Sequence, residues 1–405
     1  MRSRDSRSDG DDEITGGTVR RRTVLAALST VGTAAVAGCL GETDSSESTA
    51  SGESSAEPTT RPATESPVST TADSPSTETG PREVEDATGR TVSVPSTIEG
   101  VVAVGPGMLN LVAYLEATDM LVGVEEPEHT WARDISYNIA NPALQDLPVI
   151  GPHRGGDPEL IAAVDPDVVL ATYFTAGTAT DLQNKLETPV VVVKAESREL
   201  HRLESAYRDL RFTADILGKS DRAETVVDFF ESERERLASL SSTVTAAERP
   251  TAYYAGRSSD GGAGATSTQH PFAPFAFVEA ENVATSIEGH ASINEEKLLT
   301  WDPEYVFVSG SNLQRVTDAF SAGQYANLTA VEEEHFHALL PTRFYGNLYG
   351  NTIGDAYYVG SVLYPEAFAE IDPVERANDI YRALFGTAIY DQVADRFSEF
   401  EQISI

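Results

Sequence analysis

"DPELIAAVDPDVVLA", residues 157–171, ends in a continuous apolar run that follows an Asp-Pro pair. A second stretch, "NEEKLLTWDPEYVFV", residues 294–308, aligns with it without a gap at an offset of 137 residues. The two share a glutamate at the third position, Glu159 and Glu296, and the Asp-Pro pair. Each stretch predicts a short helix, a proline-marked turn and a buried parallel strand, because strands covered on both faces are apolar throughout. The repeat therefore predicts two α/β lobes of similar build.

The sequence around the repeat extends this pattern. Asp157 followed by Pro158 predicts the start of the first repeat helix, and Ser292 with Glu295 predicts a capping box for the second. Alternation of strands and helices predicts open, mostly parallel sheets, whose ligands bind beyond the carboxyl ends of the strands. The expected strands are 101–104, 121–124, 168–171 and 190–193 in the first lobe, and 251–255, 305–308 and 335–340 in the second.

One long helix is expected between the lobes. Residues 221–242 have apolar side chains near helical spacing and contain neither glycine nor proline. The segment predicts a single connecting helix of roughly 30 Å. An ordinary helix within one lobe is the alternative.

The N-terminal 39 residues have the features of an export signal. Arg21 and Arg22 fit a twin-arginine pattern, and the uncharged stretch 23–38 is shorter than the roughly 20 residues that span a bilayer. Cys39, the only cysteine, closes a "VAGC" sequence similar to a lipobox, which predicts lipid attachment to its sulfur. Residues 40–81 are rich in Ser, Thr, Glu and Pro, and predict a disordered stalk.

Charge and composition exclude several classes of function. The chain has 29 basic and 64 acidic residues, a net charge of −35, and only four lysines. This balance is typical of proteins adapted to molar salt, where the Debye length is roughly 3 Å. No basic stripe is present to bind nucleic acid. The sequence also contains no G-x-S-x-G or H-E-x-x-H motif, so we expect no enzyme.

Candidate ligand-binding residues come from loops that follow strands. The glycines of the 105–107 loop open a helix and could turn backbone N–H groups toward an anion. Arginines suit the carboxylates of a ligand, and aromatic side chains suit a large planar one. The candidates are Gly105, Pro106, Gly107, Trp131, His153, Arg154, Tyr173, Phe174, Arg257, Arg343, Tyr345 and Asn347. His335 and His337 alternate on an expected strand with no third ligand at useful spacing, so we interpret them as structural and expect no metal site.

Two longer stretches resemble a known family. "GPHRGGDPELIAAVDPDVVLA" (151–171) and "GDAYYVGSVLYPEAFAEIDP" (354–373) are similar to segments of class III substrate-binding proteins of ABC importers. The resemblance covers nearly all of 82–405. It implies an N-lobe at 82–220, an interlobe helix at 221–242 and a C-lobe at 243–405, that is, two Rossmann-like lobes joined by one long helix.

The resemblance also implies a function. Such a protein captures an iron(III) siderophore, haem or a corrinoid between its lobes and delivers it to a permease and its ATPase, with no cofactor of its own. In the family, one exposed glutamate per lobe contacts the permease. Glu159 and Glu296 match that position, each seven residues before the proline of its turn. We expect a monomer, lipid-anchored on the outer face of the cytoplasmic membrane. A receptor for bare zinc or manganese is the main alternative, and a surface adhesion or structural lipoprotein is a weaker one.

Overall fold

The structure, a computed structural model, describes residues 80–194, 200–257 and 264–405. These residues belong to one compact unit, Asp73–Ile405. The predicted leader at 1–39 with its Cys39, and nearly all of the predicted stalk at 40–81, lie outside the described residues. Within the described ranges, no helix is both long enough and apolar enough to cross a bilayer.

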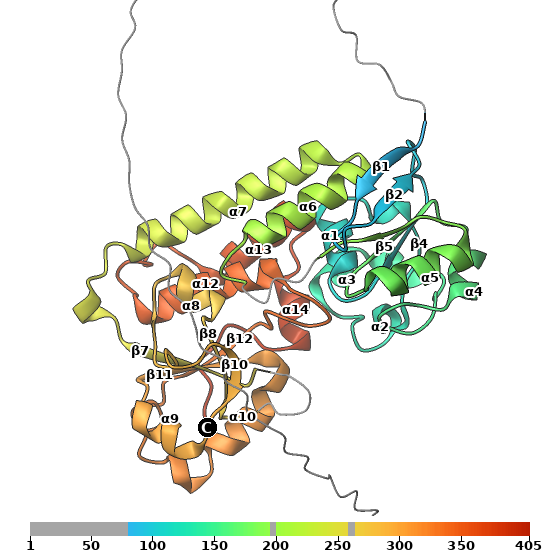
Figure 1. The fold of residues 1–405 in the computed structure, drawn as a ribbon. Helices are drawn as coiled ribbons and strands as arrows, with labels where there is room; N and C mark the ends of the chain where they lie inside the picture. Colours follow the sequence, from blue (N-terminus) through green and yellow to red (C-terminus); the bar gives the residue numbers. More distant parts are fainter. Residues whose placement is uncertain (1–79, 195–199, 258–263) are drawn as a thin grey trace, which may run out of the picture. The chain divides into compact units, whose positions relative to one another are not determined.

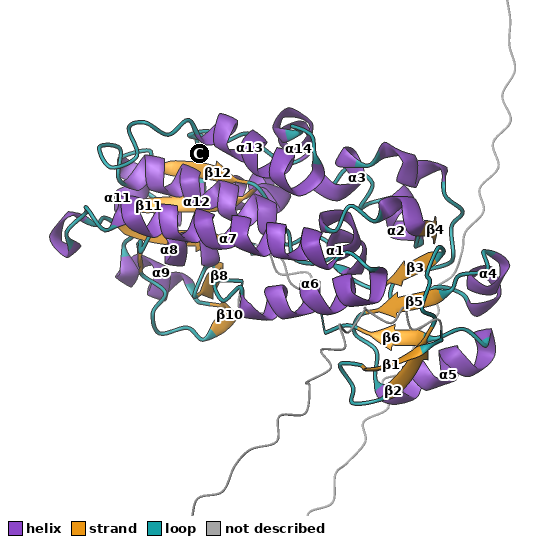
Figure 2. Cartoon of the chain, turned by 90° about the horizontal axis from the view of Figure 1, so that it is seen from above, coloured by secondary structure: helices purple, strands orange, loops and turns teal. Residues whose placement is uncertain are grey.

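Four parallel strands form the first sheet, in the order β4-β3-β5-β6. Because side chains alternate along a strand, Val102 and Val169 pack with α4 and α5, whereas Val101 and Val168 face α1 and α6. Figures 1 and 2 show these helices on the two sides of the sheet. The elements are β3 Val101–Val104, α1 Met108–Tyr114, β4 Leu121–Gly123, α2 Glu126–His129, α3 Ser136–Ala140, α4 Pro158–Ala163, β5 Val168–Ala171, α5 Ala176–Leu186, β6 Val190–Val192 and α6 Glu204–Leu217.

A second parallel sheet has the order β12-β11-β7-β9. Its strands divide their side chains in the same way: Val306 packs with α9 and α10, and Phe307 packs with α8 and α12. The predicted parallel α/β architecture is therefore confirmed in both sheets. The elements are β7 Thr251–Ala255, α8 Ala273–Phe277, β9 Glu281–Asn282, α9 Glu295–Trp301, β11 Tyr305–Ser309, α10 Leu313–Phe320, α11 Thr329–Glu332 and β12 Phe336–Leu339.

Two antiparallel strand pairs were not predicted. β1 (Arg82–Glu85) pairs with β2 (Thr91–Val94), and β8 (Ser267–His270) pairs with β10 (Gly289–Ser292). These strands lack the continuous apolar run that marked the others, because β1 and β2 have exposed polar side chains along one face.

The two repeat helices begin and end alike. Asp157 caps α4 by accepting hydrogen bonds from the backbone N–H groups of Glu159 and Leu160, at 2.9 and 3.2 Å. Asn294, which aligns with it, caps α9 by accepting from the N–H of Lys297 at 2.9 Å. The predicted capping box at Ser292 is wrong, because that residue pairs in β10.

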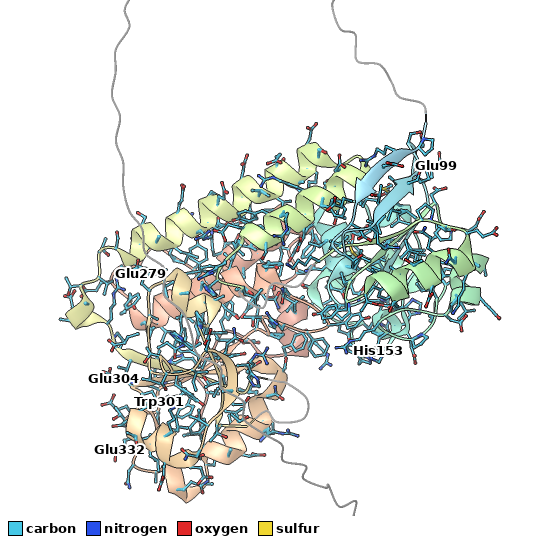
Figure 3. All side chains as sticks on the ribbon, in the orientation of Figure 1. Glu99, His153, Glu279, Trp301, Glu304 and Glu332 are labelled. Atoms are coloured by element: carbon cyan, nitrogen blue, oxygen red, sulfur yellow. The ribbon has the colours of Figure 1, made fainter. Side chains whose placement is uncertain are left out.

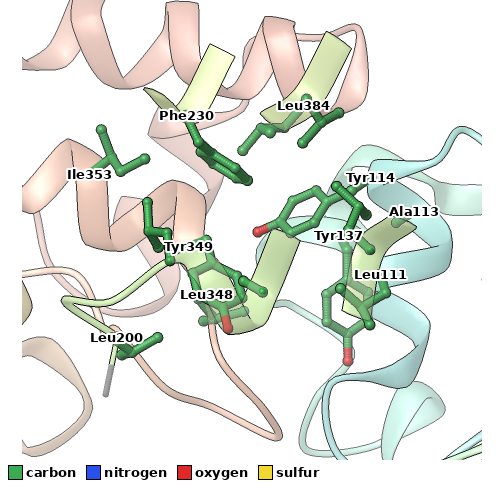
Figure 4. Packing of buried hydrophobic residues seen from close by; sticks show 14 of the residues in the cluster. Leu111, Ala113, Tyr114, Tyr137, Leu200, Phe230, Leu348, Tyr349, Ile353 and Leu384 are labelled. Atoms are coloured by element: carbon green, nitrogen blue, oxygen red, sulfur yellow. The ribbon is translucent and has the colours of Figure 1, made fainter. Parts of the chain in front are cut away.

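Helix α7 (Ser220–Ser241) covers the segment where a long helix was expected. It packs against α6 and also against α8 and the C-terminal helices α12 (Tyr349–Leu363) and α13 (Pro373–Phe385), which α14 (Tyr390–Arg396) follows. The Phe230 ring lies 6.0 Å from Tyr114 of α1 and 6.2 Å from Tyr349 of α12, ring centre to ring centre (Figure 4). One apolar core thus joins helices from both sheets, which opposes large movements between them.

A buried ion pair also ties α7 to the C-terminal helices. Glu233 of α7 accepts a hydrogen bond from Tyr357 Oη of α12 at 2.7 Å and pairs with the guanidinium of Arg376 on α13. The same guanidinium lies 5.3 Å from the centre of the Tyr357 ring. Three helices are therefore held together by one carboxylate.

Candidate functional site

The candidate site forms where loops after β3, β4, β5 and β12 meet. Gly105 follows β3, Glu125 follows β4, Tyr173 follows β5, and the loop containing Tyr345 follows β12. Hydrogen bonds join the loop of the second sheet to those of the first. Three of the predicted residues, Gly105, Tyr173 and Tyr345, thus lie in loops at the carboxyl ends of their strands.

Glu125 lies at the centre of this group and was missed at the sequence level. Its buried carboxylate accepts hydrogen bonds from the N–H of Gly105 at 2.8 Å, the N–H of Gly155 at 3.0 Å and Tyr345 Oη at 2.5 Å. Burial raises the pKa of Glu125, and its hydrogen bonds and the nearby His153 only partly oppose that rise. Its position directly after β4 was a usable signal, but one more glutamate is inconspicuous in so acidic a chain.

The glycines of the 105–107 loop serve a different purpose from the one expected. The N–H of Gly105 is bound by Glu125, and the N–H of Gly107 donates to the carbonyl of Tyr345 at 3.1 Å. A Cβ on Gly346 would lie 2.5 Å from the Cα of Gly107, so only glycine permits this close approach. The backbone N–H groups of Gly105 and Gly107 are thus both hydrogen-bonded within the protein, and Pro106 has no N–H group to donate.

Two large aromatic side chains at the site face solvent. Trp131 is 46% exposed, and its ring stands edge-on to those of Tyr345 and Phe344, at 5.0 and 5.9 Å between centres. Tyr173 is 50% exposed, and the Arg154 guanidinium lies 5.8 Å from its ring centre. Burying such rings against a ligand would recover apolar area now exposed to water.

Backbone conformation also marks the site. Nine non-glycine residues in the described ranges have a positive φ, and three of them are predicted site residues: Arg154 (64°), Tyr173 (63°) and Tyr345 (47°). Bulky side chains rarely adopt this conformation, and such strain concentrates at binding and catalytic sites. The strain supports the choice of these three residues.

The remaining candidates are placed less favourably. Arg257 follows β7, and its Nε donates to Gln269 Oε1 of β8 at 2.8 Å. The buried Asn347 donates to Tyr349 Oη at 3.2 Å and bridges to Arg343 through its backbone, which indicates a structural role in the loop. Phe174 lies against Gly155, and His153 lies at the surface of the first lobe (Figure 3).

The paired histidines of the second sheet are held by their neighbours. His335 and His337 lie on one face and both stack on Tyr305, at 4.3 and 6.1 Å between ring centres. His337 is also hydrogen-bonded to Tyr358 Oη at 3.0 Å, and burial lowers its pKa to about 4. The described part of the chain contains no group of three or more His, Cys, Asp or Glu residues able to hold a metal ion.

Glu128, one turn after Glu125, is a second buried carboxyl group. It accepts hydrogen bonds from Asn138 Nδ2 at 2.6 Å and Tyr137 Oη at 3.1 Å, and burial raises its pKa to about 7. In the folded protein Glu128 stays protonated up to about pH 7, whereas in the unfolded chain it ionises near pH 4.5. The stabilisation that comes from keeping this proton is therefore complete below about pH 4.5 and is lost as the pH rises to about 7.

Replacing Glu128 with Gln should therefore remove a pH dependence. We expect the free energy of unfolding of the wild type, relative to Glu128→Gln, to fall by about 3 kcal/mol between pH 4.5 and 7 and then to level off. Denaturant unfolding at constant salt across this range measures the difference. The exposed neighbour Glu126→Gln is the control, and a pH-independent difference for Glu128→Gln would contradict the assignment.

Comparisons with known proteins agree with this architecture. A family model described as periplasmic binding protein matches residues 101–341. The molybdate-binding protein MolA of Haemophilus influenzae is 24% identical over 334 residues, which cover 76% of this chain and 92% of that protein.

Solved structures show the same fold. MolA bound to molybdate has a TM-score of 0.61 at 20% identity, covering 76% of this chain and 98% of that one. A periplasmic solute-binding protein of Veillonella parvula has a TM-score of 0.62 at 16% identity, with 79% and 97% covered. A periplasmic haem-binding protein of Pseudomonas aeruginosa has a TM-score of 0.51 at 20% identity, with 67% and 94% covered.

Proposed function

The chain belongs to the periplasmic binding protein family of ABC importers, and from this premise we propose that it captures a bulky metal chelate. The ligand classes proposed are an iron(III) siderophore, haem or a corrinoid. The observation that carries the proposal is that two aromatic rings at the site, Trp131 and Tyr173, are about half exposed, with the Arg154 guanidinium next to the Tyr173 ring. Flat or chelated ligands bury apolar area on such rings, and an arginine pairs with their carboxylates.

Smaller ligands fit the described residues less well. A bare zinc or manganese ion would need several nitrogen or oxygen ligands from side chains, and no such group is present in the described ranges. A free oxyanion would need N–H donors, and those of Gly105, Gly107 and Gly155 are already bonded to Glu125 or Tyr345. Molybdate, the ligand of the Haemophilus protein, is therefore the small ligand to compare with the proposed chelates in a binding test.

A ligand titration tests the proposal. With Trp301→Phe as background, the fluorescence of Trp131 should be quenched by haemin, a ferric siderophore or cobalamin, and not by molybdate or Zn²⁺. Trp131→Ala or Tyr173→Ala should weaken binding by about ten- to a hundredfold, the cost of losing one buried aromatic contact. Binding of the variants is followed by calorimetry. Binding of molybdate or Zn²⁺ alone would refute the chelate proposal.

Permease contact is proposed for Glu159 and Glu296. Both are exposed and occupy the same place on the two repeat helices. Among the described residues, neither carboxylate has a hydrogen-bond or ion-pair partner. Glu295, next to Glu296, instead accepts a hydrogen bond from Gln324 Nε2 at 3.1 Å, which favours Glu296 as the contact.

The remaining proposals concern the position of the protein in the cell. Binding proteins of ABC importers act outside the cytoplasmic membrane. We propose that a lipid on Cys39 anchors this protein to the membrane, and that the protein is a monomer. Residues 40–81 would then serve as a stalk, before an N-lobe at 82–220, the interlobe helix and a C-lobe at 243–405. Mass spectrometry of the membrane fraction, with Cys39→Ala as the control, tests the lipid.

A further inference from the structure

Large apolar side chains are rarely exposed in the described part of this protein. Two of the six that are exposed, Trp131 and Tyr173, lie at the candidate site; the other four are Val149, Leu160, Leu299 and Val374. Leu160 is 46% and Leu299 is 38% exposed, and they lie on α4 and α9, the two repeat helices. Half of the exposed aliphatic side chains therefore lie on the helices that carry Glu159 and Glu296.

The helical geometry places Leu299 on the same face as Glu296, whereas Leu160 is next to Glu159 along the chain but about 100° further round α4. Leu299 follows Glu296 by three positions, so the two share a face of α9. Leu160 directly follows Glu159 at the exposed start of α4. The inner faces are formed by Ile161 and Leu298, which align in the repeat and are fully buried. These inner residues pack the helices onto their sheets, and the outer leucines belong to neither of the two core clusters.

The surface next to α9 is also hollowed. An open depression is lined by Ile293, Glu295, Glu296 and Tyr325, among others. It offers space for a side chain inserted beside Glu296. The corresponding helix α4 lies on the other lobe, well separated from α9 in both views (Figures 1 and 2).

We propose that Leu160 and Leu299 form the apolar half of the surface that contacts the permease. This inference rests on the permease contact proposed for Glu159 and Glu296. The occupant would be a pair of extracytoplasmic permease loops, each with a basic side chain next to an apolar one. Protein interfaces combine a desolvated apolar centre with a polar rim, and each lobe presents one leucine and one free carboxylate for this purpose.

High salt makes the apolar half necessary. In the molar salt that the charge of −35 indicates, the Debye length is roughly 3 Å, so exposed ion pairs contribute little attraction. Contacts between apolar groups are not screened by salt. A surface with carboxylates alone would set the orientation of the permease but would hold it weakly.

Binding of the full-length protein to its permease–ATPase complex in lipid nanodiscs tests the inference. Leu160→Gln with Leu299→Gln should weaken binding by at least tenfold at both low and molar salt. Glu159→Gln with Glu296→Gln should weaken it at low salt and much less at molar salt, because salt already screens those charges. Val374→Gln, which alters another exposed aliphatic residue, 36% exposed and on α13, should leave binding unchanged.

The outcomes are separable. If the leucine variant binds the complex as tightly as the wild type, or if Val374→Gln weakens binding equally, the apolar surface is wrong. If the glutamate variant binds normally at low salt, the permease contact on which the inference rests is wrong. Titration of Trp131 fluorescence with haemin or the ferric siderophore gives a separate readout of the ligand site, which none of these variants should change.

Discussion

Charge reversal of both glutamates, Glu159→Lys with Glu296→Lys, should abolish transport while leaving ligand affinity unchanged. Both carboxylates are exposed on short helices outside the candidate site. Against the basic permease surface that the proposal requires, each lysine would replace an attraction with a repulsion, and like charges in an interface cost several kcal/mol. At low salt, where these charges are not screened, we expect uptake to fall at least a hundredfold in the double variant and less in either single one.

Uptake of the radiolabelled chelate by reconstituted vesicles measures this effect. The control is Asp181→Lys with Glu366→Lys, which changes the net charge equally at exposed positions, one on α5 and one after α12. Normal uptake by the Glu159 and Glu296 variant would overturn the assignment. Reduced uptake by the control as well would show a general charge effect.

Removal of the Arg376 side chain should produce the largest loss of stability. Arg376→Ala leaves the buried Glu233 carboxylate with Tyr357 as its only partner among the described residues. Breaking a buried ion pair from one side typically costs roughly 3–5 kcal/mol, because the remaining charge stays desolvated. Since Glu233 holds α7 to α12 and α13, the loss should appear in global unfolding.

Denaturant unfolding of three variants separates this effect from others. Arg382→Ala, on the same helix, removes an exposed arginine that pairs with Glu375 and Asp379, and should cost far less, because solvent screens exposed ion pairs. Glu233→Leu with Arg376→Met should recover most of the loss, because apolar replacement leaves no buried charge. Equal losses for Arg376→Ala and Arg382→Ala would mean that Glu233 is not desolvated as the structure indicates.

The sequence predicted a strand or helix best where the residues of that element alone are sufficient to identify it. The apolar runs of β3, β5, β7 and β11 predicted strands at or near their observed bounds. Asp157 with Pro158 marked the start of α4, and the segment without glycine or proline marked α7. Each of these depends on residues adjacent along the chain.

Prediction failed where the outcome depends on distant partners. The strands β1, β2, β8 and β10 have little apolar character of their own, and they form because β1 pairs with β2 and β8 pairs with β10. Ser292 fits a cap by spacing, but its pairing with Ser267 places it in a strand. By sequence alone, the N–H groups of Gly105 and Gly107 could have faced a ligand. In the structure they donate hydrogen bonds to Glu125 and Tyr345, which lie 20 and 238 positions away along the chain.

The sequence by itself determined two repeated α/β lobes, a long helix and the positions of Glu159 and Glu296, because apolar periodicity and local caps are properties of neighbouring residues. Only the tertiary structure decided that Glu125 is buried against Tyr345, that Trp131 and Tyr173 face solvent, and that Leu160 and Leu299 lie outside the core. Exposure and pairing depend on which distant segments pack together, and no single stretch of the chain contains that information.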